Sequence, residues 1–308
     1  MTASTPQAVT DHSVDVREEP RTGSAGPPVR EVVVGVDGSE VGLNAVRWAA
    51  QEAARRDAPL RILHAATYLG RKGTTGGPSA EMHRARRITA QAYTVARHTA
   101  SDVPAVTEVV PDDPTTSLVR AAGDSQLVVL GSSATGAADE MVLATVAMKV
   151  AARSPRPVVV VPRRRTEPAG RPVVAVLGVG DRADDEAVAD FAATEAERLR
   201  VPLSVLQTRA TRHAAPDSWV DDPDEWGRRH PGLDVQRSDL PSARAEQLLG
   251  ETCPSPLLVI SAGHGNLLHR SMDGPHRWLL RHCTSPMALI PRAHRSELDP
   301  REEIVALG

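Results

Sequence analysis

The sequence predicts an α/β protein with two tandem domains, each built on a parallel sheet between helices. Three observations support this prediction: a length of 308 residues, apolar runs of strand length, and helix-like periodicity between those runs. The length alone suggests about two domains of roughly 100–200 residues each. Strands that alternate with helices favour a parallel sheet with right-handed crossover connections.

The chain also contains a tandem repeat, because four segments of the first half recur in the same order in the second. The pairs are 31–36 with 172–177, 58–63 with 201–206, 127–130 with 257–260, and 157–162 with 286–291. We therefore expect domains at 31–162 and 172–291, with a linker at 163–171 between them. Residues 1–29 are expected to form a disordered leader and residues 292–308 a polar tail.

Four helices are expected between the strands of the first repeat. Their ranges are 40–55, near 79–98, a helix that begins at Asp113-Pro114, and 140–152. The first has alanines at every fourth position along one face, and proline is tolerated in the first turn of the third. Each repeat thus has four strand–helix units and a final strand. The final strands, 158–161 and 287–290, are expected to pair, because pairing covers two exposed sheet edges.

Composition and charge argue against several classes of protein. The formal net charge is −3 and no run approaches 18 apolar residues, so we expect no binding to nucleic acid or to a membrane. The N-terminus lacks the apolar core of a signal peptide. The two cysteines, Cys253 and Cys283, are far apart in sequence and lack metal-ligand spacing, which argues against a disulfide and against a metal site. We therefore expect a soluble protein of the reducing cytoplasm.

Two glycine turns follow predicted strands of the first repeat. One apolar strand ends at Asp37-Gly38-Ser39, and another ends at Gly131-Ser132. A strand that stops at glycine and opens into a helix presents backbone N–H groups to an anion. In an open α/β sheet, ligands bind beyond the carboxyl ends of the strands. The sequence therefore predicts a phosphate or nucleotide site at this edge.

Three segments of the first repeat together resemble the universal stress protein family, in particular its tandem actinobacterial members. They are Val-Val-Val-Gly-Val-Asp37-Gly38-Ser39, Ala45-Val-Arg-Trp48-Ala-Ala, and Ala58-Pro59-Leu-Arg-Ile-Leu-His64-Ala65. The resemblance covers 31–162 and, more weakly, 172–291. It implies two Rossmann-like domains of the adenine nucleotide alpha hydrolase type, each a five-stranded parallel sheet between helices. It also implies a stress-response function without catalysis.

Many members of that family bind ATP, and the resemblance implies which residues would do so here. Asp37 would contact the adenosine end of the nucleotide, and Ala65 would form a wall beside the base. A glycine element would start at Gly131, but Ala134 and Ala144 occupy the positions of its second and third glycines. The full set of candidate contacts is Asp37, Gly38, Ser39, Ala65, Gly131, Ser132, Ala134, Thr145 and Val146.

The two alanines leave the nucleotide site open to two interpretations. If the turn needs a positive φ, alanine costs roughly 1–2 kcal/mol there, and its methyl group holds a phosphate away from backbone donors. The first domain therefore either binds ATP or keeps only a vestigial site. In the second repeat, Leu177 or Gly178 stands at the aspartate position and His264 replaces a glycine, so we expect a structural partner without a cofactor.

No arrangement of residues predicts catalysis, so we expect that the protein is not an enzyme. The sequence has no Gly-x-Ser-x-Gly element. Gly178-Val-Gly180 fits a dinucleotide fingerprint, but no carboxylate follows the next strand at 207–209. A nucleotide sensor and an interaction scaffold without nucleotide both stay open as functions. In either case we expect an unidentified protein partner and an internal pseudo-dimer, and a homodimer of the chain is left open.

Overall fold

The structure is a computed structural model, and it describes most of the two repeats. The described residues are 30–67, 77–132, 138–165, 170–178, 182–208, 219–240, 245–262, 279–280 and 282–292. The leader at 1–29, the polar tail beyond residue 292, and His264 lie outside them. No helix within these ranges is long and apolar enough to span a membrane.

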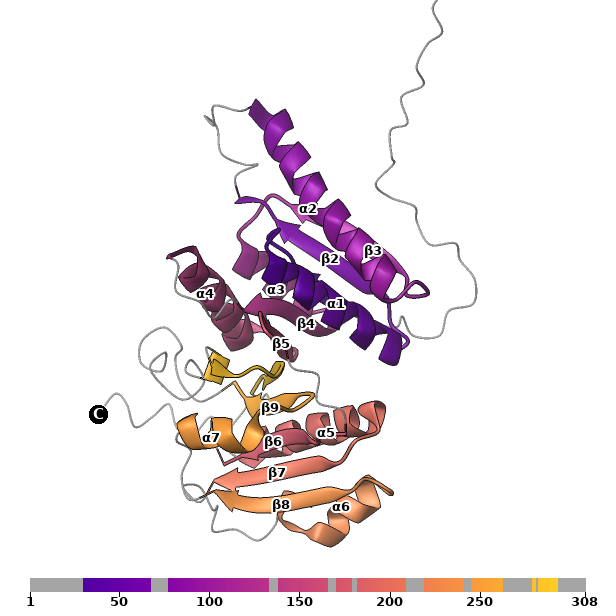
Figure 1. Ribbon diagram of the computed structural model, residues 1–308, viewed down its shortest axis with the longest axis vertical. Helices are drawn as coiled ribbons and strands as arrows, with labels where there is room; N and C mark the ends of the chain where they lie inside the picture. Colours follow the sequence, from indigo (N-terminus) through magenta and orange to yellow (C-terminus); the bar gives the residue numbers. More distant parts are fainter. Residues whose placement is uncertain are drawn as a thin grey trace, which may run out of the picture.

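The first half of the chain alternates strands and helices as the sequence predicts (Figure 1). Its elements are β1 (Glu31–Gly35), α1 (Glu40–Arg55), β2 (Leu60–Ala65), α2 (Gly77–Thr99), β3 (Ala105–Val110), α3 (Pro114–Ala122), β4 (Ser125–Ser132), α4 (Ala138–Arg153) and β5 (Val158–Pro162). Local capping explains two of the helix starts. Ser39 accepts a hydrogen bond from the Gly42 N–H at the start of α1, and Asp113 accepts one from Thr116 at the start of α3.

The second half repeats the order of the strands and of the first three helical regions, with a shorter second helical region; most of the segment between its last two strands lies outside the described residues. Its elements are β6 (Val173–Leu177), α5 (Arg182–Leu199), β7 (Leu203–Thr208), the 3₁₀ turn η3 (Trp219–Asp221), α6 (Pro223–Arg229), β8 (Val235–Leu240), α7 (Ala245–Thr252), β9 (Leu258–Ser261) and β10 (Met287–Ile290). Asp222 caps α6, and Pro223 occupies its first turn. The repeat inferred from sequence is therefore also a repeat of structure.

All ten strands form one sheet in the order β3-β2-β1-β4-β5-β10-β9-β6-β7-β8. Every neighbouring pair is parallel except β5 and β10, which run antiparallel with Val159 opposite Ala288. The predicted pairing of 158–161 with 287–290 is confirmed. It joins the two halves at the centre of the sheet, where each would otherwise present an edge.

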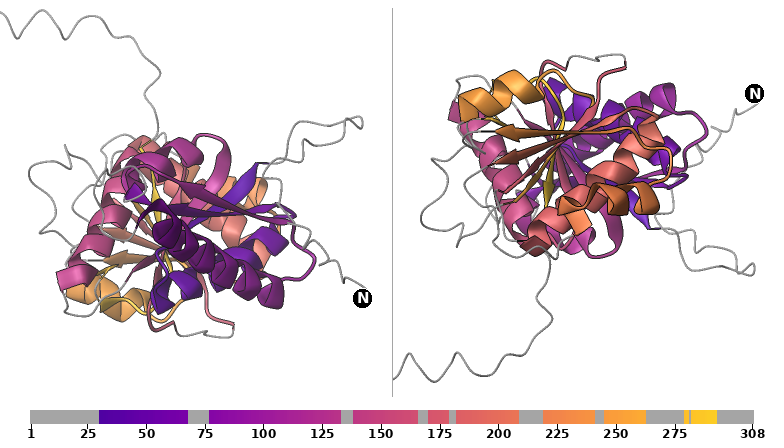
Figure 2. Two further views of the ribbon diagram at one scale, coloured as in Figure 1. Left: turned by 90° about the horizontal axis from the view of Figure 1, so that it is seen from above. Right: turned by 90° about the horizontal axis from the view of Figure 1, so that it is seen from below.

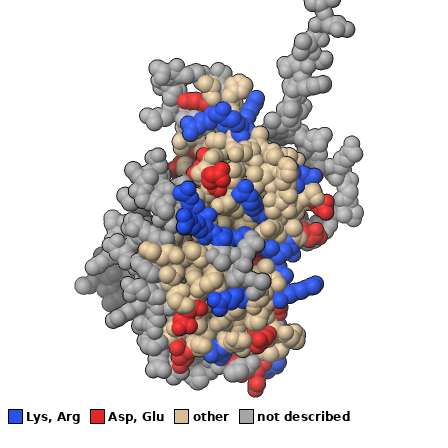
Figure 3. All heavy atoms as spheres, in the orientation of Figure 1, with Lys and Arg blue, Asp and Glu red and all other residues tan. Residues whose placement is uncertain are grey.

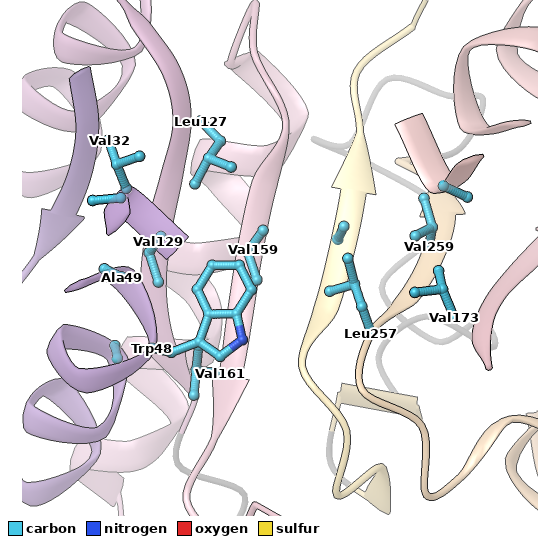
Figure 4. Packing of buried hydrophobic residues seen from close by; sticks show 14 of the residues in the cluster. Val32, Trp48, Ala49, Leu127, Val129, Val159, Val161, Val173, Leu257 and Val259 are labelled. Atoms are coloured by element: carbon cyan, nitrogen blue, oxygen red, sulfur yellow. The ribbon is translucent and has the colours of Figure 1, made fainter. Parts of the chain in front are cut away.

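Helices cover both faces of this sheet (Figure 2). Residues alternate between the faces along each strand, so that Val32 and Val34 of β1 join one apolar cluster and Val33 joins the other. On the first face, Trp48 of α1 lies beside Val159 and Val161 of β5 (Figure 4). The cores consist mainly of Ala, Val and Leu, as the low aromatic content requires.

The linker between the halves is attached to α1. The side chain of Asn44 donates a hydrogen bond of 3.0 Å to the carbonyl oxygen of Arg163, and Arg165 donates one of 3.4 Å to Gln51. Arg163 and Arg164 are exposed. Lys and Arg side chains gather across the middle of the face drawn in Figure 3, at the level where the halves meet.

One expectation from sequence is wrong: Cys253 and Cys283 form a disulfide, with their Cα atoms 6.3 Å apart. Cys253 follows α7 and precedes β9, while Cys283 precedes β10. Because β9 and β10 are adjacent and parallel, the segments before them start from the same edge of the sheet. A sequence separation of 30 residues gives no sign of that proximity.

Candidate functional site

The candidate site lies where β1 and β4 end, at the carboxyl edge of the first half. After β1, the chain passes through Asp37 and Gly38 to Ser39, which caps α1. Gly38 has a φ of +88°, a conformation that L side chains rarely adopt. This glycine therefore allows the strand to turn directly into the helix.

Asp37 places a carboxylate beside the N-terminus of α1. Its Oδ1 accepts hydrogen bonds from the Ser39 N–H at 3.0 Å and from the Ser39 hydroxyl at 2.7 Å. The partial positive charge at the helix N-terminus stabilises an anion there. Asp37 is exposed, and within the described part of the chain its Oδ2 accepts no hydrogen bond. That oxygen is therefore available to a donor from a ligand.

Gly131 brings the end of β4 against the same helix. A Cβ at this position would lie 2.7 Å from the carbonyl oxygen of Val41 and 2.9 Å from its carbonyl carbon. Both atoms belong to the backbone of the first turn of α1, so a side chain at 131 would collide with the helix. The structure thus brings Gly131, Asp37 and Ser39 together around the start of α1, as the sequence predicts.

This contact leads to a prediction about stability. Replacing Gly131 with alanine is expected to lower the free energy of unfolding by about 1–3 kcal/mol, because the helix backbone must shift to admit the methyl group. Urea denaturation measures the loss. Gly227→Ala is the control, since a Cβ there meets no atom within 4 Å and the position is helical. Equal stability of both variants would contradict the close approach of β4 to α1.

His64 fixes the exit of β1, a role that the sequence does not reveal. Its Nδ1 lies 2.8 Å from the carbonyl oxygen of Val36, and the ring is buried. A carbonyl oxygen can only accept, so Nδ1 is the donor of this bond. Ala65 follows at the end of β2, half-buried and paired with Val110. The histidine thus holds β2 and the turn before Asp37 in register.

The structure describes only some of the other residues predicted to contact the nucleotide. Ser132 is buried and pairs with Pro162 at the end of β4. Val146 of α4 is half-buried against the apolar cluster on the second face. Thr145 lies in α4, but its side chain lies outside the described residues, as does Ala134.

The second half has a carboxylate at the equivalent edge, but it comes from a helix. The Gly178 N–H, which directly follows β6, donates to both oxygens of Asp185 at 2.9 and 3.0 Å. Asp185 belongs to the first turn of α5 and is buried. The N–H that a ligand would use is therefore already bound by the protein itself. The acidic pair at the start of α5 is visible in the sequence, yet nothing there indicates that Asp185 bonds to a residue seven positions earlier.

The described part of the chain offers no cluster of metal ligands. Among the residues that the structure describes, no three or more His, Cys, Asp or Glu side chains are grouped so that they could hold a metal ion. Two carboxyl groups between α1 and α5 have perturbed pKa values, and their surroundings in the protein explain both. Burial raises the pKa of Glu195. Burial also opposes ionisation of Glu52, but Arg56 and Arg55 outweigh it and lower the pKa of that group.

Comparisons with known proteins agree with this architecture. The model of the universal stress protein family matches residues 28–162. The chain is 25% identical over 282 residues to universal stress protein Rv2624c of Mycobacterium tuberculosis, a match that covers 88% of this chain and all of that protein. It is 27% identical over 270 residues to Rv2028c of the same organism, covering 84% and 95%.

A crystal structure of a universal stress protein from Archaeoglobus fulgidus has the same fold. It superimposes with a TM-score of 0.66 over 86% of this chain and 97% of that one, at 12% sequence identity. Identity at this level supports the fold and not the ligand. The family match and the relatives that span both halves lead to one conclusion: residues 28–162 form a domain of the universal stress protein family, and the chain as a whole is similar to universal stress proteins of similar length.

Proposed function

We propose that the first half binds an adenine nucleotide, and that the protein acts in the cytoplasm by presenting nucleotide-bound and nucleotide-free states to a protein partner. It does so without turnover, because among the described residues no activated nucleophile or paired acid and base adjoins the site. The observation that carries this proposal is the position of Asp37. Its carboxylate is fixed beside the N-terminus of α1 through Oδ1, while Oδ2 is left for a ligand.

The neighbouring elements fit a nucleoside. A carboxylate oxygen accepts hydrogen bonds from ribose hydroxyl groups, and a small side chain, that of Ala65, ends β2, the strand that pairs with β1. The start of α4, which follows β4, lies on the same edge and presents the N-terminal N–H groups of a helix to phosphate. We assign the adenosine end to Asp37 and Ala65 and the phosphates to the end of β4, with Gly38, Ser39, Gly131, Ser132, Ala134, Thr145 and Val146 around them.

The second half is proposed as a structural domain. The bond between Gly178 and Asp185 occupies the equivalent strand-end donor with a carboxylate that would also repel phosphate. We therefore propose one nucleotide per chain, and the boundaries 31–162 and 172–291 for the binding and the structural domain.

The proposal predicts stabilisation by nucleotide that depends on Asp37. At a concentration ten times its dissociation constant, a ligand that binds only the folded state adds about 1.4 kcal/mol to stability. We expect millimolar ATP to raise the melting temperature of the wild type, and Asp37→Asn to abolish the rise while leaving the ligand-free protein folded. Differential scanning fluorimetry with ATP, ADP and AMP measures the effect, and isothermal titration calorimetry gives the stoichiometry.

The matched control is Asp124→Asn, which changes the net charge equally at an exposed position just before β4, on the opposite edge of the sheet. It should keep the full response to nucleotide. An unresponsive wild type would leave the interaction scaffold as the function. A response that survives in Asp37→Asn would place the nucleotide elsewhere.

A further inference from the structure

The disulfide lies at the strand that connects the two halves. It joins the end of α7, at Cys253, to the segment before β10, at Cys283. On one side β10 pairs with β9, and on the other it pairs with β5 of the first half. Anything that fixes or releases the start of β10 therefore acts on the junction between the halves.

The surroundings of the two sulfur atoms suit a thiol that can ionise. The Ser285 N–H donates to the Cys283 Sγ at 3.4 Å, and the Ser285 hydroxyl lies 3.6 Å from the Cys253 Sγ. The same hydroxyl accepts from the Ser255 N–H at 2.8 Å, which fixes its position. Donors beside sulfur stabilise the thiolate, the form that exchanges with disulfides. Cys253 is half-buried and Cys283 is buried, so of the two cysteines Cys253 is the one that a small disulfide or thiol in the solvent reaches more easily.

We propose that Cys253 and Cys283 form a reversible redox pair whose oxidation fixes β10 and so strengthens the junction between the halves. The proposal is independent of the nucleotide site. In a reducing cytoplasm, where we place the protein, a disulfide that forms is usually transient and redox-sensing rather than structural. The chain has no other cysteine, so no third thiol competes for either partner.

The reaction needs a small-molecule disulfide as oxidant. The Cys253 thiolate attacks one sulfur of that disulfide, which forms a mixed disulfide and releases one small thiolate. The Cys283 thiolate then attacks the Cys253 sulfur and releases the second. In total two protein thiols lose two electrons and two protons, and one small disulfide becomes two small thiols.

Oxidation closes a loop that contains β9, since the two cysteines are 30 residues apart. The cross-link restricts the unfolded chain and holds the start of β10. Reduction should therefore lower the melting temperature by about 5–10 °C. It should also speed amide exchange in β5 and β10 by about tenfold, while β1 and β2 change little.

The test uses the full chain equilibrated in buffers that range from oxidised to reduced glutathione. Thiol alkylation and mass spectrometry give the oxidised fraction, and hydrogen exchange with mass spectrometry reports on β5. Cys253→Ser and Cys283→Ser should have the melting temperature and the amide exchange of the reduced wild type, and neither property should change with the redox buffer. The double variant, which has no thiol, controls for direct effects of glutathione.

Three outcomes would overturn the proposal. A pair that stays oxidised in fully reduced glutathione would be a structural disulfide, and one that never oxidises would not be a redox pair. Equal exchange in β5 for the oxidised and reduced wild type would show that the bond does not act on the junction. Because the wild type is compared with itself, a serine variant that fails to fold does not decide the result.

Discussion

Replacing Arg56 with methionine is expected to lower the free energy of unfolding by about 3–5 kcal/mol, because it leaves two buried glutamate side chains without the cation they share. The guanidinium donates to Glu52 at 2.6 Å through Nε and to Glu195 at 2.6 Å through Nη2. The three side chains are 5%, 1% and 2% exposed. Water therefore cannot replace the lost bonds.

Arg56 also connects the halves of the molecule. It is the C-cap residue of α1 in the first half, while Glu195 belongs to α5 in the second, 139 residues further along the chain. Its Nη1 donates to Gln126 of β4 at 3.2 Å, and its charge lies 5.9 Å from the ring centre of Phe191 on α5. Loss of the guanidinium should weaken the contact between α1 and α5 as well as the total stability.

Urea denaturation at neutral pH measures the change. Arg55→Met is the matched control, since Arg55 contacts the same Glu52 at 2.7 Å but its side chain is 29% exposed. Its loss should cost less than about 1 kcal/mol. Adding Glu195→Gln to Arg56→Met should recover part of the stability, because it removes a buried carboxyl group whose remaining described cationic partner is Arg198, at 2.6 Å and with a side chain that is 32% exposed. Equal losses for Arg55→Met and Arg56→Met would contradict the role given to the buried cation.

Much of the fold could be predicted because its signals are local. The start of α1 at Glu40 follows from Ser39, and the start of α3 follows from Asp113 and Pro114, residues that act on the adjoining turn. The strands were predictable because both faces are covered, so they are almost continuously apolar. Pairing of β5 with β10 followed from the same pattern, since two apolar edges favour burial against each other.

The site was predictable in position but not in its contacts. Strand-end glycines and the rule for open α/β sheets correctly brought Asp37 and Gly131 to one edge. The close approach of Gly131 to Val41 depends on where α1 packs. The bond from Gly178 to Asp185 depends on how far the first turn of α5 reaches back. Neither geometry has a periodic or compositional signature.

Contacts between the halves were the least predictable. Arg56 and Glu195 look like ordinary surface residues of helices, because charged side chains usually lie on the solvated face. Burial becomes visible only once α1 and α5 are placed beside the joined sheet. The disulfide was not predicted for the same reason. The two cysteines are 30 residues apart in sequence, but they precede adjacent parallel strands, which bring them close together.

The second large effect is a dependence of stability on pH that originates at Glu195. Burial, and then the charge of Glu52, raise the pKa of Glu195 to about 7, although Arg56 and Arg198 oppose the rise. Burial also disfavours ionisation of Glu52, but Arg56 and Arg55 outweigh it and hold the pKa of Glu52 below its usual range. The pair therefore retains one proton, on Glu195, at mildly acidic pH.

The sign of the effect follows from proton binding. An unfolded glutamate loses its proton near its ordinary pKa of 4.5, whereas folded Glu195 keeps it until about pH 7. Between these values the folded state holds the extra proton, so its stability is greatest at the acidic end and is lost as the pH rises. The slope approaches about 1.4 kcal/mol per pH unit within this window. Below pH 4.5, the lowered pKa of Glu52 has the opposite effect, so that stability falls as the pH falls.

Urea denaturation of the wild type and of Glu195→Gln at pH 5, 6, 7 and 8 isolates this contribution. The wild type should lose about 2–3 kcal/mol relative to the variant across the series, because glutamine cannot release a proton. Glu186→Gln is the control on the same helix, because the side chain of Glu186 is 34% exposed. Its free energy of unfolding should change with pH as that of the wild type does. If the free energies of unfolding of the wild type and of Glu195→Gln changed equally with pH, Glu195 would already be ionised at pH 5. The three arginines around the pair would then stabilise both carboxylates as anions, and α1 and α5 would be held by a permanent ionic contact rather than by one that weakens towards alkaline pH.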